Sequence, residues 1–116
     1  METPKIHEGE YRLCLILWEN EPIKSTDLAK LCKVKLEWSK TTTYTVIKRL
    51  SERGVIKNEN AIVTSIISKE EAQQSELEEL MDKKFEGSLP AFIAAFGMRQ
   101  ALSDAEIEEI RKIIER

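Results

Sequence analysis

A run of hydroxyl and cationic side chains marks residues 38–50, WSKTTTYTVIKRL. Threonine is a mediocre helix former, yet Val46, Ile47 and Leu50 have helical spacing. Short hydroxyl side chains at a helix N-terminus can hydrogen-bond phosphate oxygens or base edges, and the helix dipole favours an anion there. The stretch is therefore typical of a helix that enters the major groove of DNA.

The two faces of this helix are predicted to differ. Ser39 is the expected N-cap and Gly54 is placed to end the helix in the left-handed conformation. The core-facing residues are Thr43, Val46, Ile47 and Leu50, and the candidate DNA-binding residues are Lys40, Thr41, Thr42, Tyr44, Thr45, Lys48 and Arg49.

Roles within this DNA-binding set follow from side-chain chemistry. We expect Lys40 and Lys48 to bind phosphates and Thr41, Thr42 and Thr45 to contact base edges, whereas Tyr44 could do either. Arg49 lies beside the core and either reaches a phosphate or pairs with an acid of the first helix. The alternative, that the threonines only cap a helix, explains Ser39 but not three further threonines of poor propensity.

Charge is distributed unevenly along the chain. The whole sequence has a formal charge of -3, but residues 30–57 contain eight basic and two acidic residues. Residues 1–68 hold 11 basic and 9 acidic residues, and residues 69–116 hold 7 and 12. The basic stretch could steer the protein toward a polyanion or be an ordinary solvated face.

The elements around the candidate helix predict a winged helix-turn-helix domain over residues 1–68. An apolar stripe predicts a helix over residues 8–19, and a second helix is expected to begin at Ser25, whose hydroxyl can cap it. Beyond Gly54, two β-branched runs in VIKNENAIVTSII flank turn-forming residues 58–60 and predict a β-hairpin. The fold class is mostly α with this small hairpin as the wing.

Residues 69–116 are predicted to form three helices that dimerise. Capping boxes, Ser68 with Glu71 and Ser103 with Glu106, begin two of them, and Gly87 separates the first from a helix with Pro90 in its first turn. A segment this short cannot bury its own apolar stripes, so we expect it to pair with a second copy, or alternatively to fold back on its own winged helix. The expected dimerisation residues are Leu80, Phe85, Phe92, Ile93, Phe96, Ile107, Ile110, Ile113 and Ile114.

Nothing in the sequence predicts an enzyme, a metal site or a cofactor. There is one histidine, and neither a glycine-rich phosphate loop nor an identifiable catalytic carboxylate pair. Cys14, Cys32 and His7 lack the spacing of zinc ligands, and the cysteines are expected to be reduced, buried thiols. Without a leader-like or membrane-spanning apolar run, the chain is expected to be a soluble cytoplasmic protein that does not bind membranes.

Three segments, EYRLCLILW, EWSKTTTYTVIKRLSERGVI and LSDAEIEEIRKIIER, together resemble the penicillinase repressor family of BlaI/MecI/CopY type. The resemblance covers nearly the whole chain and implies a homodimeric transcriptional repressor of antibiotic-resistance type genes. Its winged helix would bind a palindromic double-stranded DNA operator. In the family the recognition helix begins just after the tryptophan matched by Trp38, which selects Lys40, Thr41, Thr42, Tyr44, Thr45 and Arg49.

The resemblance also bears on regulation. In β-lactam-responsive members a sensor-protease system leads to cleavage of an Asn-Phe bond in the dimerisation helices, and the matching bond here is Ala95-Phe96, with alanine in place of asparagine. Copper-responsive members end in a cysteine cluster, whereas no cysteine follows Cys32. The wing KNENAIVTS is short and has no basic tip, so few wing contacts to phosphate are expected. The alternative to a repressor is a winged-helix module that binds proteins and no DNA.

Overall fold

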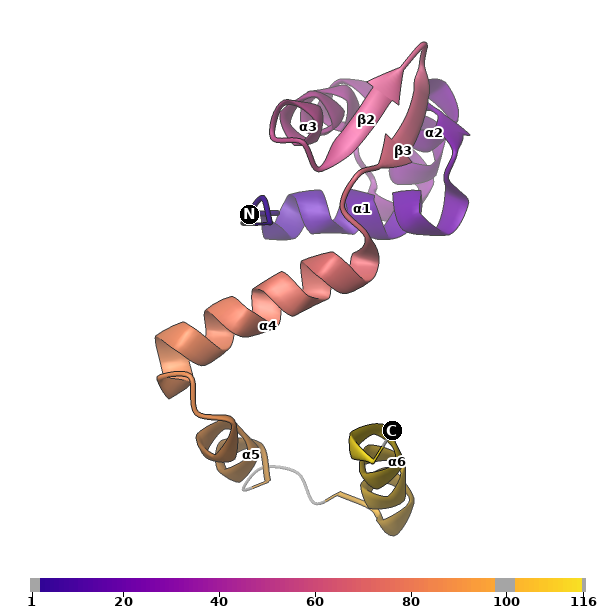
Figure 1. Cartoon of the computed structure of the whole chain (residues 1–116). Helices are drawn as coiled ribbons and strands as arrows, with labels where there is room; N and C mark the ends of the chain where they lie inside the picture. The colour runs from indigo at the N-terminus through magenta and orange to yellow at the C-terminus, as the bar shows by residue number, and fades with distance from the viewer. Residues whose placement is uncertain (1–2, 98–101, 116) are drawn as a thin grey trace. The chain divides into compact units, whose positions relative to one another are not determined.

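The structure is a computed structural model that describes residues 3–97 and 102–115. In chain order the elements are α1 (Glu8–Asn20), β1 (Ile23–Lys24), α2 (Ser25–Leu36), α3 (Lys40–Glu52), β2 (Ile56–Glu59), β3 (Ile62–Ser65), α4 (Lys69–Phe85), α5 (Leu89–Gly97) and α6 (Asp104–Ile114), as Figure 1 shows. The chain forms two compact units, Met1–Glu76 and Leu77–Arg116.

The core of the first unit lies between three helices and a small sheet. Each helix contributes one buried stripe, and the sheet closes the cluster; its largest fully buried residues include Leu13, Leu17, Leu28, Leu50, Val55, Ile56 and Val63. Three helices followed by a β-hairpin is the winged helix-turn-helix arrangement. The predicted fold class is therefore confirmed.

The sheet has three strands, not the two that the sequence predicted. Its order is β1-β3-β2, with antiparallel pairing throughout, and β1 joins through Ile23 opposite Val63. Two residues between Pro22 and α2 are too few for any alternation of polar and apolar residues to be visible in the sequence. The tertiary pairing with β3 alone makes them a strand.

The turn of the wing also lies later than expected. Asn58 and Glu59 belong to β2, and the turn is made by Asn60 and Ala61, whose φ angles are 53° and 64°. Two consecutive residues with positive φ are the pattern of a two-residue type I′ hairpin, which suits asparagine and then glycine. Ala61 therefore adopts a backbone conformation that its Cβ disfavours.

Replacing Ala61 by glycine should stabilise the first unit by about 1 kcal/mol, because glycine adopts positive φ without steric cost. Both tryptophans, Trp18 and Trp38, lie in this unit, so urea unfolding followed by tryptophan fluorescence measures it. The matched control is Ala29→Gly, the same change within α2, which should destabilise. Equal signs for the two variants would contradict the assignment of strain to Ala61.

Three helix-terminus predictions can be compared with the structure. Ser39 is the N-cap of α3 and accepts a hydrogen bond from Thr42 N at 3.1 Å, and Gly54 has a φ of 77°, so both are confirmed. The prediction that Ser25 caps α2 is wrong. Ser25 is buried as the first residue of α2, its N–H donates to Ala61 O at 2.8 Å, and Lys24 occupies the N-cap position. The β1–β3 pairing has drawn the serine inward.

A largely buried ion pair joins the start of α1 to the end of α3. Arg53 donates to the Glu10 carboxylate, which also accepts from His7 N at 2.9 Å. Burial alone would raise the pKa of Glu10, but the hydrogen bonds from Arg53 and His7 outweigh it and lower the pKa below its ordinary value. The pair fixes the C-terminal end of α3 against α1.

Glu10→Gln should cost about 1 kcal/mol of stability at neutral pH, since a charge-assisted hydrogen bond becomes a neutral one. The folded pKa of Glu10 is depressed, so its ionic contribution is complete above the unfolded pKa of about 4.3 and is lost as the pH falls through the folded value. Urea unfolding from pH 3 to pH 8 should therefore show the gap between wild type and variant closing at the acid end. A gap that is constant with pH would contradict this account.

Candidate nucleic-acid interface

The outward face of α3 carries the predicted DNA-binding residues. Lys40, Thr41, Thr42, Thr45, Lys48 and Arg49 are exposed, and Tyr44 is half-buried. Among the residues expected to face inward, Thr43 is 0% exposed and Ile47 and Leu50 are buried, whereas Val46 is only half-buried. The helix is thus held by three inward side chains and presents hydroxyls and cations on its other side.

The threonine hydroxyls of α3 differ in whether they can still donate or accept a hydrogen bond to a ligand. Ser39 Oγ donates to Thr42 Oγ1 at 2.9 Å, so the Thr42 hydroxyl keeps its own proton for donation. Thr45 Oγ1 donates to Thr41 O at 2.9 Å and keeps its acceptor capacity. The Thr41 hydroxyl has no partner within residues 3–97 and 102–115, so it can both donate and accept. Sequence reasoning missed this distinction because it depends on rotamers.

The cations on this face are Lys40, Lys48 and Arg49. Lys40 Nζ lies 5.9 Å from the centroid of the Tyr44 ring, a cation–π distance that orients the two side chains together. Lys48 and Arg49 form no ion pair within the part of the chain that the structure describes. The ion pair between the first helix and the end of α3 is made by Glu10 with Arg53.

The wing, by contrast, has a paired charge. Lys57 Nζ lies 2.8 Å from Glu59 Oε2, one strand pleat away on β2. Their hydrogen bond and mutual attraction raise the pKa of Lys57 and lower that of Glu59. The remaining residues near the wing tip, Asn58, Asn60 and Ala61, are uncharged. That the wing makes few contacts to phosphate stays a prediction.

The two thiols are buried among core residues. Burial raises the pKa of Cys14 to about 12 and raises that of Cys32 as well. Thiols so strongly protonated at neutral pH are poor nucleophiles and poor metal ligands. Within the described residues no group of three or more His, Cys, Asp or Glu side chains could hold a metal ion, and no helix is long and apolar enough to cross a membrane.

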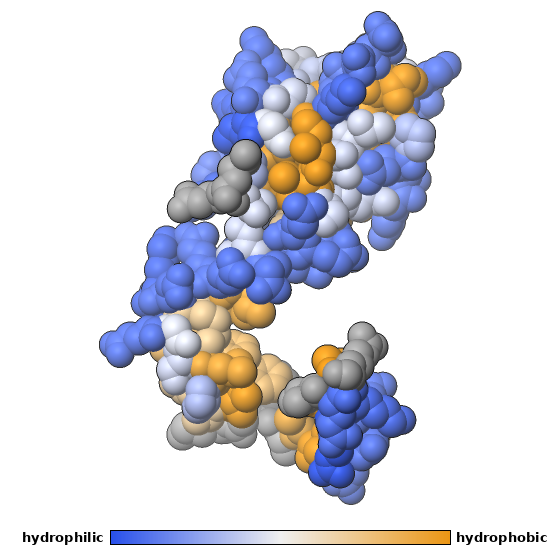
Figure 2. Space-filling model, viewed as in Figure 1, coloured by the Kyte–Doolittle hydropathy of each residue, from blue (hydrophilic) through white to orange (hydrophobic). Residues whose placement is uncertain are grey.

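The second unit exposes much of its apolar surface. Phe92 packs edge-on against Phe85 and parallel to Phe96, with ring centroids 5.4 Å and 6.3 Å apart. Figure 2 shows apolar surface gathered over α5. The predicted dimerisation residues that are exposed are Leu80, Ile93, Phe96, Ile107, Ile110 and Ile113, and the side chain of Ile114 lies outside what is described.

Local structure at the ends of these helices agrees with the sequence. The capping boxes are present: Ser68 Oγ accepts from Glu71 N at 3.0 Å, and Ser103 Oγ accepts from Glu106 N at 3.1 Å. Gly87, with a φ of 75°, follows the end of α4. Ala95 and Phe96 lie exposed in the last turn of α5.

Comparison with known proteins places the chain in a family. A family model described as "Penicillinase repressor" matches residues 6–116. The methicillin resistance regulatory protein MecI of Mammaliicoccus sciuri is 24% identical over 119 residues, covering 99% of this chain and 97% of that protein. The penicillinase repressor of Bacillus licheniformis is 22% identical, with 98% and 92% covered.

A solved structure, that of the transcriptional regulator SlyA, also overlaps with the chain. The match covers 94% of this chain and 71% of the SlyA chain, with a TM-score of 0.43 and 20% identity. The family model matches nearly the whole chain, including the winged helix with its exposed hydroxyl and cationic side chains on α3. The chain belongs to the penicillinase repressor family and is a DNA-binding transcriptional repressor, not an enzyme.

Proposed function

We propose that the protein is a homodimer that represses transcription by occupying a palindromic operator, with α3 of each protomer in a major groove. The observation that carries this proposal is the outward face of α3, where hydroxyls with unused hydrogen-bonding capacity lie among cations that form no ion pair with any described residue. Thr41, Thr42 and Thr45 read base edges, Lys40, Lys48 and Arg49 bind phosphates, and Tyr44 contacts either. The first turn of α3 also directs its free N–H groups toward the anion.

Dimerisation is assigned to residues 69–116 and DNA binding to residues 1–68. Ile93 and Phe96 on α5 and Ile107, Ile110 and Ile113 on α6 are exposed, which exceeds the scattered apolar residues of an ordinary monomer surface. In a two-fold dimer the same patch faces itself, so one stripe per helix suffices for both protomers. Two copies of α3 would then address two inverted half-sites.

The regulated genes are proposed to be of antibiotic-resistance type, since the relatives include a methicillin resistance regulatory protein and a penicillinase repressor. Inactivation by a sensor-protease system would cut Ala95-Phe96. Both residues lie exposed in the last turn of α5, which must unwind to enter a protease as an extended segment. The alanine before this bond makes the cleavage specificity differ from that for an asparagine.

A salt titration tests the proposal against its alternative, a protein-binding winged helix. Fluorescence anisotropy with a duplex selected from a random library should give a dissociation constant that rises steeply with salt. With about three phosphate contacts per protomer, the slope of log affinity against log salt should be about -5. No measurable duplex affinity at low salt would refute DNA binding and leave the protein-interaction module.

The wing supplies a second prediction. Glu59→Gln removes the partner of Lys57 and should tighten DNA binding by about two- to fivefold at low salt, because a free cation then faces the polyanion. The matched control is Glu8→Gln, which releases Arg12 on α1 in the same way. Anisotropy at two salt concentrations measures both variants. An equal gain for both would show that overall charge, not the wing, is responsible.

A further inference from the structure

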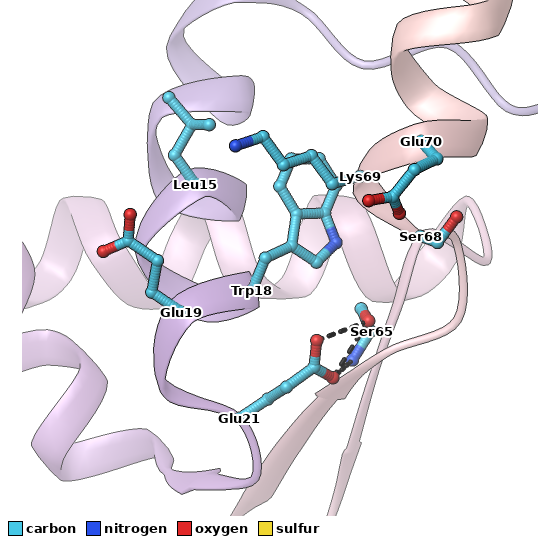
Figure 3. A pocket seen from close by; sticks show the side chains of 8 residues that line it. All are labelled: Leu15, Trp18, Glu19, Glu21, Ser65, Ser68, Lys69 and Glu70. Atoms are coloured by element: carbon cyan, nitrogen blue, oxygen red, sulfur yellow. Dashed lines mark hydrogen bonds between the residues drawn. The ribbon is translucent and has the colours of Figure 1, made fainter. Parts of the chain in front are cut away.

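The segment that joins β3 to α4 is held against α1 by side chains on both sides of a crevice. Figure 3 shows Trp18 and Glu21 from the end of α1 facing Ser65 and Ser68 of that segment. The crevice has a volume of about 270 Å³. We call residues 65–68 the α4 junction.

Two tethers cross from α1 to the α4 junction. Trp18 Nε1–H donates to Ile67 O at 3.0 Å, across 49 residues of sequence. The Glu21 carboxylate accepts from Ser65 N at 2.8 Å and from Ser65 Oγ at 2.8 and 2.9 Å, across 44 residues. Both tethers use polar groups whose geometry is directional, unlike apolar packing.

The α4 junction also bonds to Val55, which lies between α3 and β2. Ile66 N and Ile67 N both donate to Val55 O, at 2.9 and 3.1 Å. Beyond the junction, Ala72 in the first turn of α4 is only 3% exposed and belongs to the core of the first unit. The start of α4 is therefore fixed relative to the winged helix up to Glu76, where the first unit ends.

Trp18 and Glu21 lie at the edge of the core, where each also bonds to the α4 junction. The Trp18 ring is half-buried and borders the open crevice, and Glu21 is half-buried as well. Trp18 packs against the core and also directs its N–H at Ile67 O, and the Glu21 carboxylate accepts from both donors of Ser65, its N–H and its hydroxyl. Both groups therefore bond to the segment from which α4 starts.

We infer that Trp18 and Glu21 are positioning residues that set the direction of α4 as it leaves the winged helix, and thereby the spacing between half-sites that the dimer accepts. This inference rests on the proposed function, because it requires a dimer on a palindrome. In such a dimer, distance and rotation between the two recognition helices must match the half-site spacing. Loosening the start of α4 should broaden the accepted spacings and leave the reading of one half-site unchanged.

The test uses the full chain and duplexes built from a half-site selected by the wild type. One duplex carries a single half-site, and the others carry two inverted half-sites with the selected spacing or with about two base pairs added or removed. The variant is Trp18→Phe with Glu21→Met, which removes the donor and the acceptors at similar size. The control is Ser51→Ala, which removes the half-buried hydrogen bond to Ile47 O at 2.8 Å, away from the α4 junction.

Wild type and control should lose about tenfold or more in affinity on each altered spacing, whereas the variant should lose less than about threefold, with single half-site affinity within about twofold of wild type. An unchanged spacing profile, or an equal loss on single and paired half-sites, would overturn the inference and leave the repressor intact. Failure of the wild type to prefer paired over single half-sites would instead overturn the proposed function, and the inference with it.

Discussion

Ile110→Asp should convert the protein into a folded monomer that binds its operator poorly. Ile110 is 42% exposed on α6, so within one chain the aspartate remains partly hydrated and costs little. In a two-fold interface the same change buries two unpaired carboxylates, at about 2 kcal/mol each or more. The dimer should therefore weaken by roughly a thousandfold, which corresponds to about 4 kcal/mol.

Sedimentation velocity across micromolar concentrations measures the change, and anisotropy on the paired half-sites measures its consequence for DNA. The control is Ala105→Asp, exposed on the same helix at about 150° from the isoleucine stripe. It introduces the same charge and should leave the dimer intact. A wild type that sediments as a monomer at micromolar concentration would refute the assignment of residues 69–116 to dimerisation.

Thr41→Val should lower the preference for operator over random DNA by about 1–3 kcal/mol, because it removes a hydroxyl whose donor and acceptor are both unused among the described residues. Valine keeps the shape and the β-branch, so helix propensity and the methyl contact change little. Thr41→Ser reverses the test by keeping the hydroxyl and removing the methyl. If serine and not valine causes the loss, the contact is with a thymine methyl.

Lys48→Ala should weaken binding to operator and random duplex about equally, since a phosphate contact carries no sequence information, and should reduce the salt slope of the proposed dimer by about 2, one for each protomer. Anisotropy on the two duplexes at several salt concentrations separates this result from that of Thr41→Val. If both variants lower the preference alike, the division of α3 into base-reading and phosphate-binding residues is wrong.

Periodicity and capping chemistry were sufficient to predict the main helices. Ser39 and the two capping boxes are local signals in which a side chain bonds backbone three residues away. Gly54 is local as well, because glycine tolerates the positive φ at the end of the helix. The burial of Thr43, Ile47 and Leu50 likewise follows from a 3.6-residue period.

Features that depend on distant residues escaped prediction. β1 exists because Ile23 meets Val63, and Ser25 is buried because its N–H reaches Ala61 O. The partners of Trp18 and Glu21 are more than forty residues away in sequence, as are those of Arg53. No pattern within a helix or turn encodes such pairings, and the free state of the Thr41 hydroxyl depends on rotamer choices that its sequence neighbours leave open.

The paired charge on the wing has a consequence for how a promoter is found. With Lys57 engaged by Glu59, each protomer of the proposed dimer would read DNA through α3 alone, and its half-site would be short. A short DNA sequence recurs by chance among the roughly 10⁶ or more competing sites of a genome. One such half-site could not identify a promoter, so in the proposed dimer selectivity would come from two half-sites at a fixed separation.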